Sequence, residues 1–69
     1  MEKDNLQPHQ QRVVDELNEV RERHSKLGAF ILDNPIYLSL PKEEKKDLKI
    51  QCNAMAIYVD ALERRVSRF

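Results

Sequence analysis

Cysteine and histidine are the residue types in this chain most able to do chemistry, and both are scarce. The 69 residues include one cysteine, Cys52, and two histidines, His9 and His24. A Cys–His pair can act as nucleophile and base where the thiolate is accessible and has a positive neighbour. No Gly-rich loop accompanies either residue, and the chain lacks the CxxC and HxxxH spacings of a metal site. We therefore expect a protein that is not an enzyme and needs no cofactor, with a metal shared between copies as the lesser alternative.

Two basic clusters and one tyrosine are the remaining parts from which a ligand site can be built. Guanidinium groups fork onto phosphate, and a tyrosine ring stacks on a base. In an oligomer, the two clusters can converge from different chains on one pocket. Because the sequence has no phosphate loop, solvated helix surface is the alternative interpretation of both clusters. The candidate ligand-binding residues are Tyr58, Lys45, Lys49, Arg64, Arg65 and Arg68, with Lys46 beside them.

Composition and charge exclude several classes of function. The chain carries 12 basic and 12 acidic residues, and nonspecific nucleic-acid binding needs a positive field. The longest apolar run, Ala54 to Val59, is too short to span a membrane. No charged start followed by an apolar stretch occurs near Met1, so we expect no secretory signal. A lone thiol suits a reducing compartment, and we expect a cytoplasmic protein.

Two ladders of apolar residues with heptad spacing predict two helices that pack along one seam. Folding the chain back near Tyr37 places Val13 opposite Leu62, and His24 opposite Cys52 in a partly buried polar layer. We predict an all-α antiparallel two-helix hairpin with a short helical turn at the tip, oligomerising into a helical bundle. The ladders are Leu6, Val13, Leu17, Val20, Leu27 and Ile31, and then Leu48, Cys52, Met55, Val59, Leu62, Val66 and Phe69.

Prolines predict the boundaries of the elements, because they suit the first turn of a helix and disfavour helical geometry in the residue before them. We expect a flexible segment at 1–7 and one helical-hairpin domain at 8–69, with helices over about 8–33 and 41–68 and the tip at 34–40. Gly28 is either a tolerated defect, costing roughly 1 kcal/mol against alanine, or a place where another helix approaches closely. The tip residues expected to pack inward are Ile36, Tyr37, Leu38 and Leu40.

Apolar residues outside the seam predict contacts with further copies of the chain. The run Ala54 to Val59 is apolar on every side, whereas one partner helix covers a stripe only about 100° wide. We expect a homo-oligomer, either a dimer forming an antiparallel four-helix bundle or a higher closed assembly. The predicted interface residues are Ile50, Ala54, Ile57, Tyr58, Ala61, Phe30 and Val14.

A pattern spread over residues 12–66 resembles a group of short helical-hairpin accessory proteins of bacteriophages and prophages, including relatives of a crAss-like phage protein. The resemblance implies a protein that acts inside an infected bacterial cell. A more distant likeness is to the hairpin domain of phage immune-evasion sponges, which sequester cyclic nucleotide signals of bacterial defence systems such as CBASS and Thoeris. The residues that carry the first resemblance are Leu27, Phe30, Ile31, Leu40, Pro41, Lys42, Glu43, Glu44, Leu48, Gln51, Met55, Tyr58, Leu62 and Arg65.

These likenesses and the residue patterns together predict a protein that acts by binding. The first hypothesis is a phage accessory protein that engages a host protein or counters a defence system through its oligomeric bundle. The alternatives are a sponge for cyclic di- or oligonucleotides and a small structural or regulatory coiled-coil adaptor. The expected partners are further copies of the chain and either a host protein or a cyclic nucleotide, with no membrane.

Overall fold

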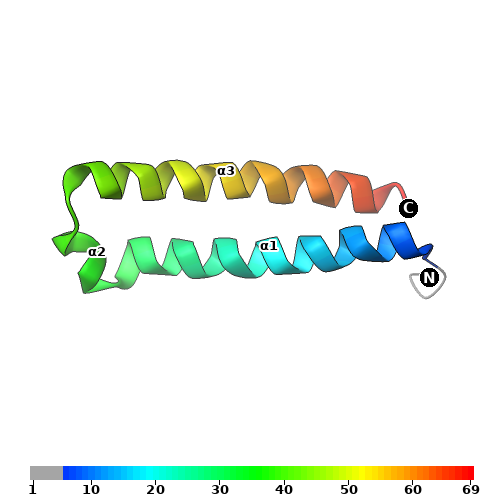
Figure 1. Cartoon of the computed structure of the whole chain (residues 1–69), viewed down its shortest axis with the longest axis horizontal. Helices are drawn as coiled ribbons and strands as arrows, with labels where there is room; N and C mark the ends of the chain where they lie inside the picture. Colours follow the sequence, from blue (N-terminus) through cyan, green and yellow to red (C-terminus); the bar gives the residue numbers. More distant parts are fainter. Residues whose placement is uncertain (1–5) are drawn as a thin grey trace.

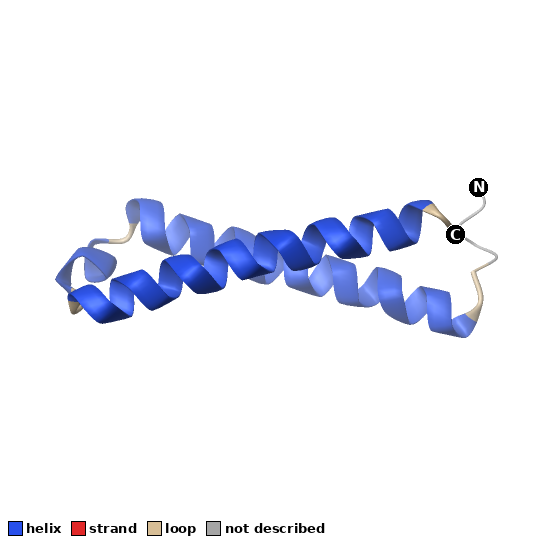
Figure 2. Ribbon diagram, turned by 90° about the horizontal axis from the view of Figure 1, so that it is seen from above, coloured by secondary structure: helices blue, strands red, loops and turns tan. Residues whose placement is uncertain are grey.

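The protein is a helical hairpin in the computed structural model, which describes residues 6–69. Helix α1 (Pro8–Asp33) runs along the molecule, α2 (Pro35–Ser39) forms the tip, and α3 (Lys42–Ser67) returns beside α1 (Figure 1). Seen from above, α1 and α3 cross (Figure 2). The molecule is a rod measuring 48 × 16 × 15 Å. The described residues contain no strand, so the predicted all-α hairpin is confirmed.

Local hydrogen bonds explain where the helices begin and end. Pro8 occupies the first turn of α1, and the backbone N–H of Gln7 donates to Oε1 of Gln10 at 2.9 Å. At the tip, Oδ1 of Asn34 accepts from the backbone N–H of Ile36 at 2.9 Å and caps α2. Pro41 is the extended residue before α3, where its missing N–H costs nothing. Leu6 is half-buried, and the rest of the predicted flexible segment, residues 1–5, lies outside the described residues.

The hydrophobic core lies in the half of the hairpin away from the tip, which we call the stem. Leu62 of α3, 1% exposed, is buried with three residues of α1, and Val59 and Val66 pack against this cluster. Towards the tip, the same seam is only half-buried. The α1 members of the core are Val13, Leu17 and Val20, and the half-buried seam residues are His24, Leu27, Ile31, Leu48, Cys52 and Met55.

A single tyrosine fills the tip. Tyr37 is 5% exposed, meets the ring of Phe30 edge-on at a centroid distance of 6.1 Å, and carries the ammonium of Lys45 at 5.9 Å from its ring centroid. The prediction that Ile36 and Leu38 also pack inward is wrong, because they are 59% and 72% exposed. A helix of one turn presents only one face to its neighbours. Tyr37 and the half-buried Leu40 occupy that face.

Gly28 does not mark a close approach between the helices of this chain. A Cβ added to Gly28 would meet no atom within 4 Å. The glycine instead leaves open space beside the half-buried part of the seam.

Removing the Leu62 side chain should unfold most of the protein. A buried Leu→Ala change costs about 2–5 kcal/mol, whereas a chain of this size holds only about 3–5 kcal/mol of net stability. We expect Leu62→Ala to lose most of its helical circular dichroism at 25 °C. Leu38→Ala, the same change at a 72% exposed position, serves as the control and should melt like the wild type. Equal effects of both changes would show that the stem core does not hold the hairpin together.

Removing the hydroxyl of Tyr37 should stabilise the hairpin. This hydroxyl is buried and has no hydrogen-bond partner among the described residues. An unsatisfied buried polar group costs about 1–3 kcal/mol, and Tyr37→Phe retains the ring contacts. A gain of 1 kcal/mol corresponds to a rise of roughly 4–8 °C in the melting temperature. Tyr58→Phe, at a 42% exposed tyrosine, should leave the melt unchanged. A lower melting temperature for Tyr37→Phe would reveal a partner for the hydroxyl in the assembled protein.

Candidate binding site

Four lysines share one face of α3 near the tip, which we call the lysine face. They stand at helical spacings i, i+3, i+4 and i+7, which place them on one side of the helix. The acidic residues interleaved with them lie roughly 150° away around the helix axis. The protein thus has a locally positive surface although its net charge is zero. The lysine face consists of Lys42, Lys45, Lys46 and Lys49, and the acidic residues turned away are Glu43, Glu44 and Asp47.

An apolar groove lies beside the lysine face, between α1 and α3. It has a volume of about 300 Å³ and is lined from α1 by Gly28, Ile31 and Leu32, and from α3 by Lys49, Cys52 and Asn53. Gly28 adds no side chain to this space, and a Cβ built on it would meet no atom within 4 Å. Beside the groove, a shallow hollow of about 440 Å³ on the surface of α3 alone is lined by the four lysines together with Ile50 and Asn53. Lys49 and Asn53 line both spaces, so the lysine face borders the apolar groove.

The arrangement suits a ligand that is part apolar and part anionic. The side chains of Ile31 and Leu32 offer an apolar wall, and the amide of Asn53 offers both a donor and an acceptor. Lys49 lines both the groove and the neighbouring hollow, and an ammonium group can contact an anion. Within residues 6–69, the ion pairs of the structure engage none of the four lysines. Lys45 lies over the ring of Tyr37, whereas Lys42, Lys46 and Lys49 have no such contact among the described residues.

The structure divides the predicted ligand residues between the two ends of α3. Lys45 and Lys49 belong to the lysine face, whereas the arginine cluster begins 15 residues beyond Lys49, or about 22 Å along the helix. Tyr58 follows Lys49 by nine residues and so lies on the opposite side of α3. Arg64 pairs with Asp60 on its own helix. One small ligand therefore cannot contact Lys49, Tyr58 and the arginines within a single chain.

Both members of the predicted Cys–His pair lie in the seam. His24 and Cys52 are both half-buried in the seam, and Cys52 borders the apolar groove. Among residues 6–69, no group of three or more histidine, cysteine and acidic side chains is placed to hold a metal ion. His9 is exposed at the start of α1.

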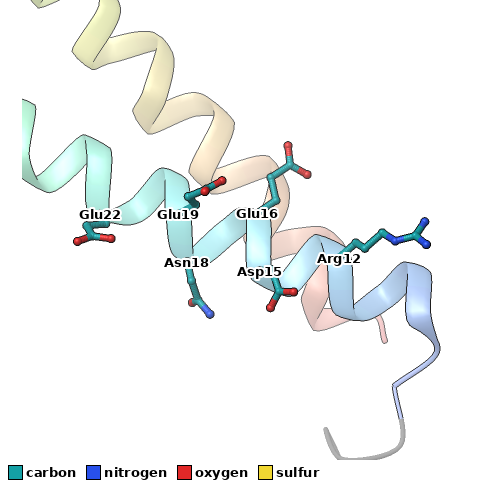
Figure 3. A pocket seen from close by; sticks show the side chains of 6 residues that line it. All are labelled: Arg12, Asp15, Glu16, Asn18, Glu19 and Glu22. Atoms are coloured by element: carbon teal, nitrogen blue, oxygen red, sulfur yellow. The ribbon is translucent and has the colours of Figure 1, made fainter.

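A shallow hollow on the outer side of α1 is lined mostly by acidic residues. All of its residues come from one helix, and their side chains point in different directions instead of converging (Figure 3). This arrangement is typical of solvated helix surface. The lining residues are Arg12, Asp15, Glu16, Asn18, Glu19 and Glu22.

Sequence reasoning missed four residues of the groove and one lysine. The i, i+3, i+4, i+7 spacing of the lysines identifies Lys42 as a member of the same helix face. Grouping residues by their closeness in the sequence hides this spacing. The α1 residues could not be identified as ligand contacts from the sequence. Whether a glycine borders a cavity depends on the residue that faces it in the fold, and the sequence does not give that residue. The residues missed are Gly28, Ile31, Leu32, Asn53 and Lys42.

The protein is thus a small helical hairpin with an open apolar groove bordered by lysines. The family model described as Sequestin matches residues 7–68, nearly the whole chain. The protein therefore belongs to the Sequestin family, whose name indicates a binding or sequestering role. No curated protein and no solved structure matches the chain. No helix within residues 6–69 has the length and hydrophobicity needed to span a membrane.

Replacing Gly28 by alanine should stabilise the protein. Alanine favours a helix interior over glycine by about 1 kcal/mol, and the added methyl group meets no atom within 4 Å. We expect a rise of several degrees in the melting temperature. The reverse change at the neighbouring exposed position, Ala29→Gly, should lower it by a similar amount. A Gly28→Ala protein that melts earlier than the wild type would show that a second chain approaches the helix at this point.

Proposed function

We propose that this protein sequesters a cyclic di- or oligonucleotide in the groove beside the lysine face. The observation that carries the proposal is the match to the Sequestin family over residues 7–68. The chemistry of the site supports the ligand class, because a nucleotide combines a flat ring with phosphate groups. The ring fits the apolar wall of Ile31 and Leu32, and the phosphates lie against the lysines.

Sequestration requires tight binding and no chemical step. The groove offers an amide, an ammonium group and apolar surface, which suffice to hold a ligand in place. In this proposal, the protein lowers the free concentration of a signal in proportion to the number of protein copies present. The signals in question are those of bacterial anti-phage defence of the CBASS or Thoeris type. The protein is then a phage or prophage product that acts in the cytoplasm of the infected bacterium.

We further propose that the protein works as a homo-oligomer. Ile50, Ile57 and Tyr58 are 55%, 71% and 42% exposed, and Ala54 beside them is also exposed. Apolar surface of this extent on one helix is typical of an interface. The other predicted interface residues contribute less: Ala61 and Val14 are half-buried, and Phe30 packs its ring against Tyr37 within the same chain.

The exposed side chains at the tip favour a second candidate function. Ile36 and Leu38 project from α2 with 59% and 72% of their surface exposed. Two apolar side chains on a protruding turn suit the pocket of another protein, such as a host protein. In that case the tip, and not the groove, carries the activity.

Ligand binding should raise the melting temperature, because the groove exists only in the folded protein and not in the unfolded chain. Ligand present at 100 times its dissociation constant adds about 2.7 kcal/mol of stability, which corresponds to a rise of roughly 10 °C or more. We expect this rise with at least one member of a panel of cyclic di- and trinucleotides, followed by circular dichroism. Lys49→Gln should reduce the affinity at least tenfold, because a charged hydrogen bond contributes about 1.5–3 kcal/mol. Arg23→Gln, a charge removed from the exposed surface of α1, is the matched control and should bind like the wild type.

The single cysteine reports directly on occupancy of the groove. Cys52 lines the groove, so a bound ligand should slow its modification by a thiol reagent. Gly28→Met, which places a side chain in the open space, should abolish binding while the protein stays helical. A melt unchanged by every nucleotide in the panel would refute the proposal. Recovery of one bacterial protein by the wild type, but not by an Ile36→Ser/Leu38→Ser variant, would then favour the tip.

A further inference from the structure

The outer side of α3 carries a second heptad pattern, distinct from the seam. Eight residues separated alternately by four and three positions form one continuous stripe, which we call the outer stripe. The stripe is centred about 130° around the helix from the seam residues Leu48, Met55 and Leu62, so it faces away from α1. Its members are Glu43, Asp47, Ile50, Ala54, Ile57, Ala61, Arg64 and Arg68.

The outer stripe is open to solvent along almost its whole length. Ile50 and Ile57 are 55% and 71% exposed. The side chain of Arg64 is 61% exposed. Ala61 is half-buried, and the remaining four residues are exposed. Nothing in α1 or α2 covers this face, although its spacing is that of a helix–helix interface.

The chemistry of the outer stripe changes in order along the helix. Its first two residues, Glu43 and Asp47, are acidic, its four central residues are apolar, and its last two, Arg64 and Arg68, are basic. A stripe with this polarity is complementary to a copy of itself that runs in the opposite direction. Run in the same direction, two copies would place acid beside acid and arginine beside arginine, which is unfavourable.

We propose that a second copy of this chain docks on the outer stripe, with its α3 antiparallel to the first. Glu43 then lies opposite Arg68 of the partner subunit, and Asp47 opposite Arg64 of the partner subunit. Between these ion pairs, Ile50 meets Ala61 of the partner subunit and Ala54 meets Ile57 of the partner subunit. Each layer joins a large apolar residue to a small one, which lets the two helix backbones approach closely.

Residues beside the stripe agree with the same register. In an antiparallel helix pair, the flanking positions on one edge of the stripe face their equivalents in the other chain. Glu44 stands on that edge near the start of α3, and Arg65 stands on it near the end. Antiparallel docking places Glu44 near Arg65 of the partner subunit, a third pair of opposite charges at each end.

The existing contact of Arg64 does not compete strongly with this interface. Arg64 pairs with Asp60 one turn earlier on α3, and both side chains are 61% exposed. Exposed ion pairs of this kind contribute little to stability, so the arginine is free to reach a partner. Asp60 remains next to the stripe and stays within reach of the same guanidinium group.

Docking on the outer stripe leaves the apolar groove between α1 and α3 open, and Ile50 alone is shared between the stripe and the residues beside the lysines. The lysine face is centred about 100° around α3 from the stripe, and the groove lies farther round towards α1. The inference rests on the proposed function only in that it specifies the interface of the proposed oligomer. The ligand plays no part in it.

Charge exchange between two variants tests both the face and the direction of docking. Arg64→Glu/Arg68→Glu makes both ends of the stripe acidic, and Glu43→Arg/Asp47→Arg makes both ends basic. By light scattering during size-exclusion chromatography, we expect the wild type at twice the chain mass of 8.2 kDa. Each variant alone should run at the mass of one chain. An equimolar mixture of the two variants should return to twice that mass.

Controls separate loss of docking from loss of folding. Circular dichroism must show that each variant remains helical, and recovery in the mixture confirms that both are competent. Arg12→Glu/Arg23→Glu, which reverses two charges on exposed positions of α1, should dimerise like the wild type.

Three outcomes would overturn the inference. A wild type that stays at 8.2 kDa at millimolar concentration would remove the second copy altogether. Variants that still dimerise alone would place the interface on another face, and the proposed oligomer would survive. Variants that dissociate but fail to associate when mixed would rule out the antiparallel pairing. The nucleotide-dependent melt is measured separately, so failure here leaves the sequestering function standing.

Discussion

The burial of Leu62 among three residues of α1 is the contact on which the rest of the structure depends. It closes the stem, and Tyr37 closes the tip by touching Phe30 of α1 and Lys45 of α3. Between these two anchors, the seam residues are half-buried. An exposed ion pair also joins the helices, from Arg21 of α1 to Glu63 of α3 at 2.7 Å. The groove lies between the two anchors and is bordered by Gly28 and Cys52. A site placed between two fixed points can remain open without loss of the hairpin, because its lining contributes little to the core.

Helical phase explains how a chain without net charge presents surfaces of different sign. On α3, residues one position apart point about 100° apart, so lysines and acids alternate in sequence but separate in space. The same separation places an acidic hollow on the outer side of α1. Composition averages these faces to zero and therefore says nothing about local binding. The spacing of charged residues along each helix, in contrast, shows that acidic and basic side chains lie on different sides of the rod.

The sequence predicts the stem well and the tip and groove poorly, for physical reasons. Val13, Leu17, Val20 and Leu62 follow a period that only one helix face can satisfy, so their burial is predictable from spacing. Ile36 and Leu38 are as apolar as their neighbours, yet both are exposed, because a single helical turn cannot bury all of its sides. Hydrophobicity alone does not predict which side stays exposed to solvent. The groove depends on what faces Gly28 across the seam, which is a tertiary property. Only the apolar centre of the outer stripe is recognisable as an interface from the sequence, because its charged ends gain a role only when a second copy is placed against them.

Helix α3 supplies most of the surface for every role argued for this protein, and it does so by dividing its circumference. One face holds Leu62 and the seam, a second holds the lysines, and a third holds the outer stripe. Helix α1 completes the seam and contributes the apolar wall of the groove. Because the three faces are centred about 100° or more apart, most residues on one face can change without touching the others, and Ile50, which belongs to the outer stripe and also lies beside the lysines, is the exception. Folding, ligand binding and assembly are therefore separable by substitution in a chain of 69 residues, which is what a protein that acts by holding a ligand requires.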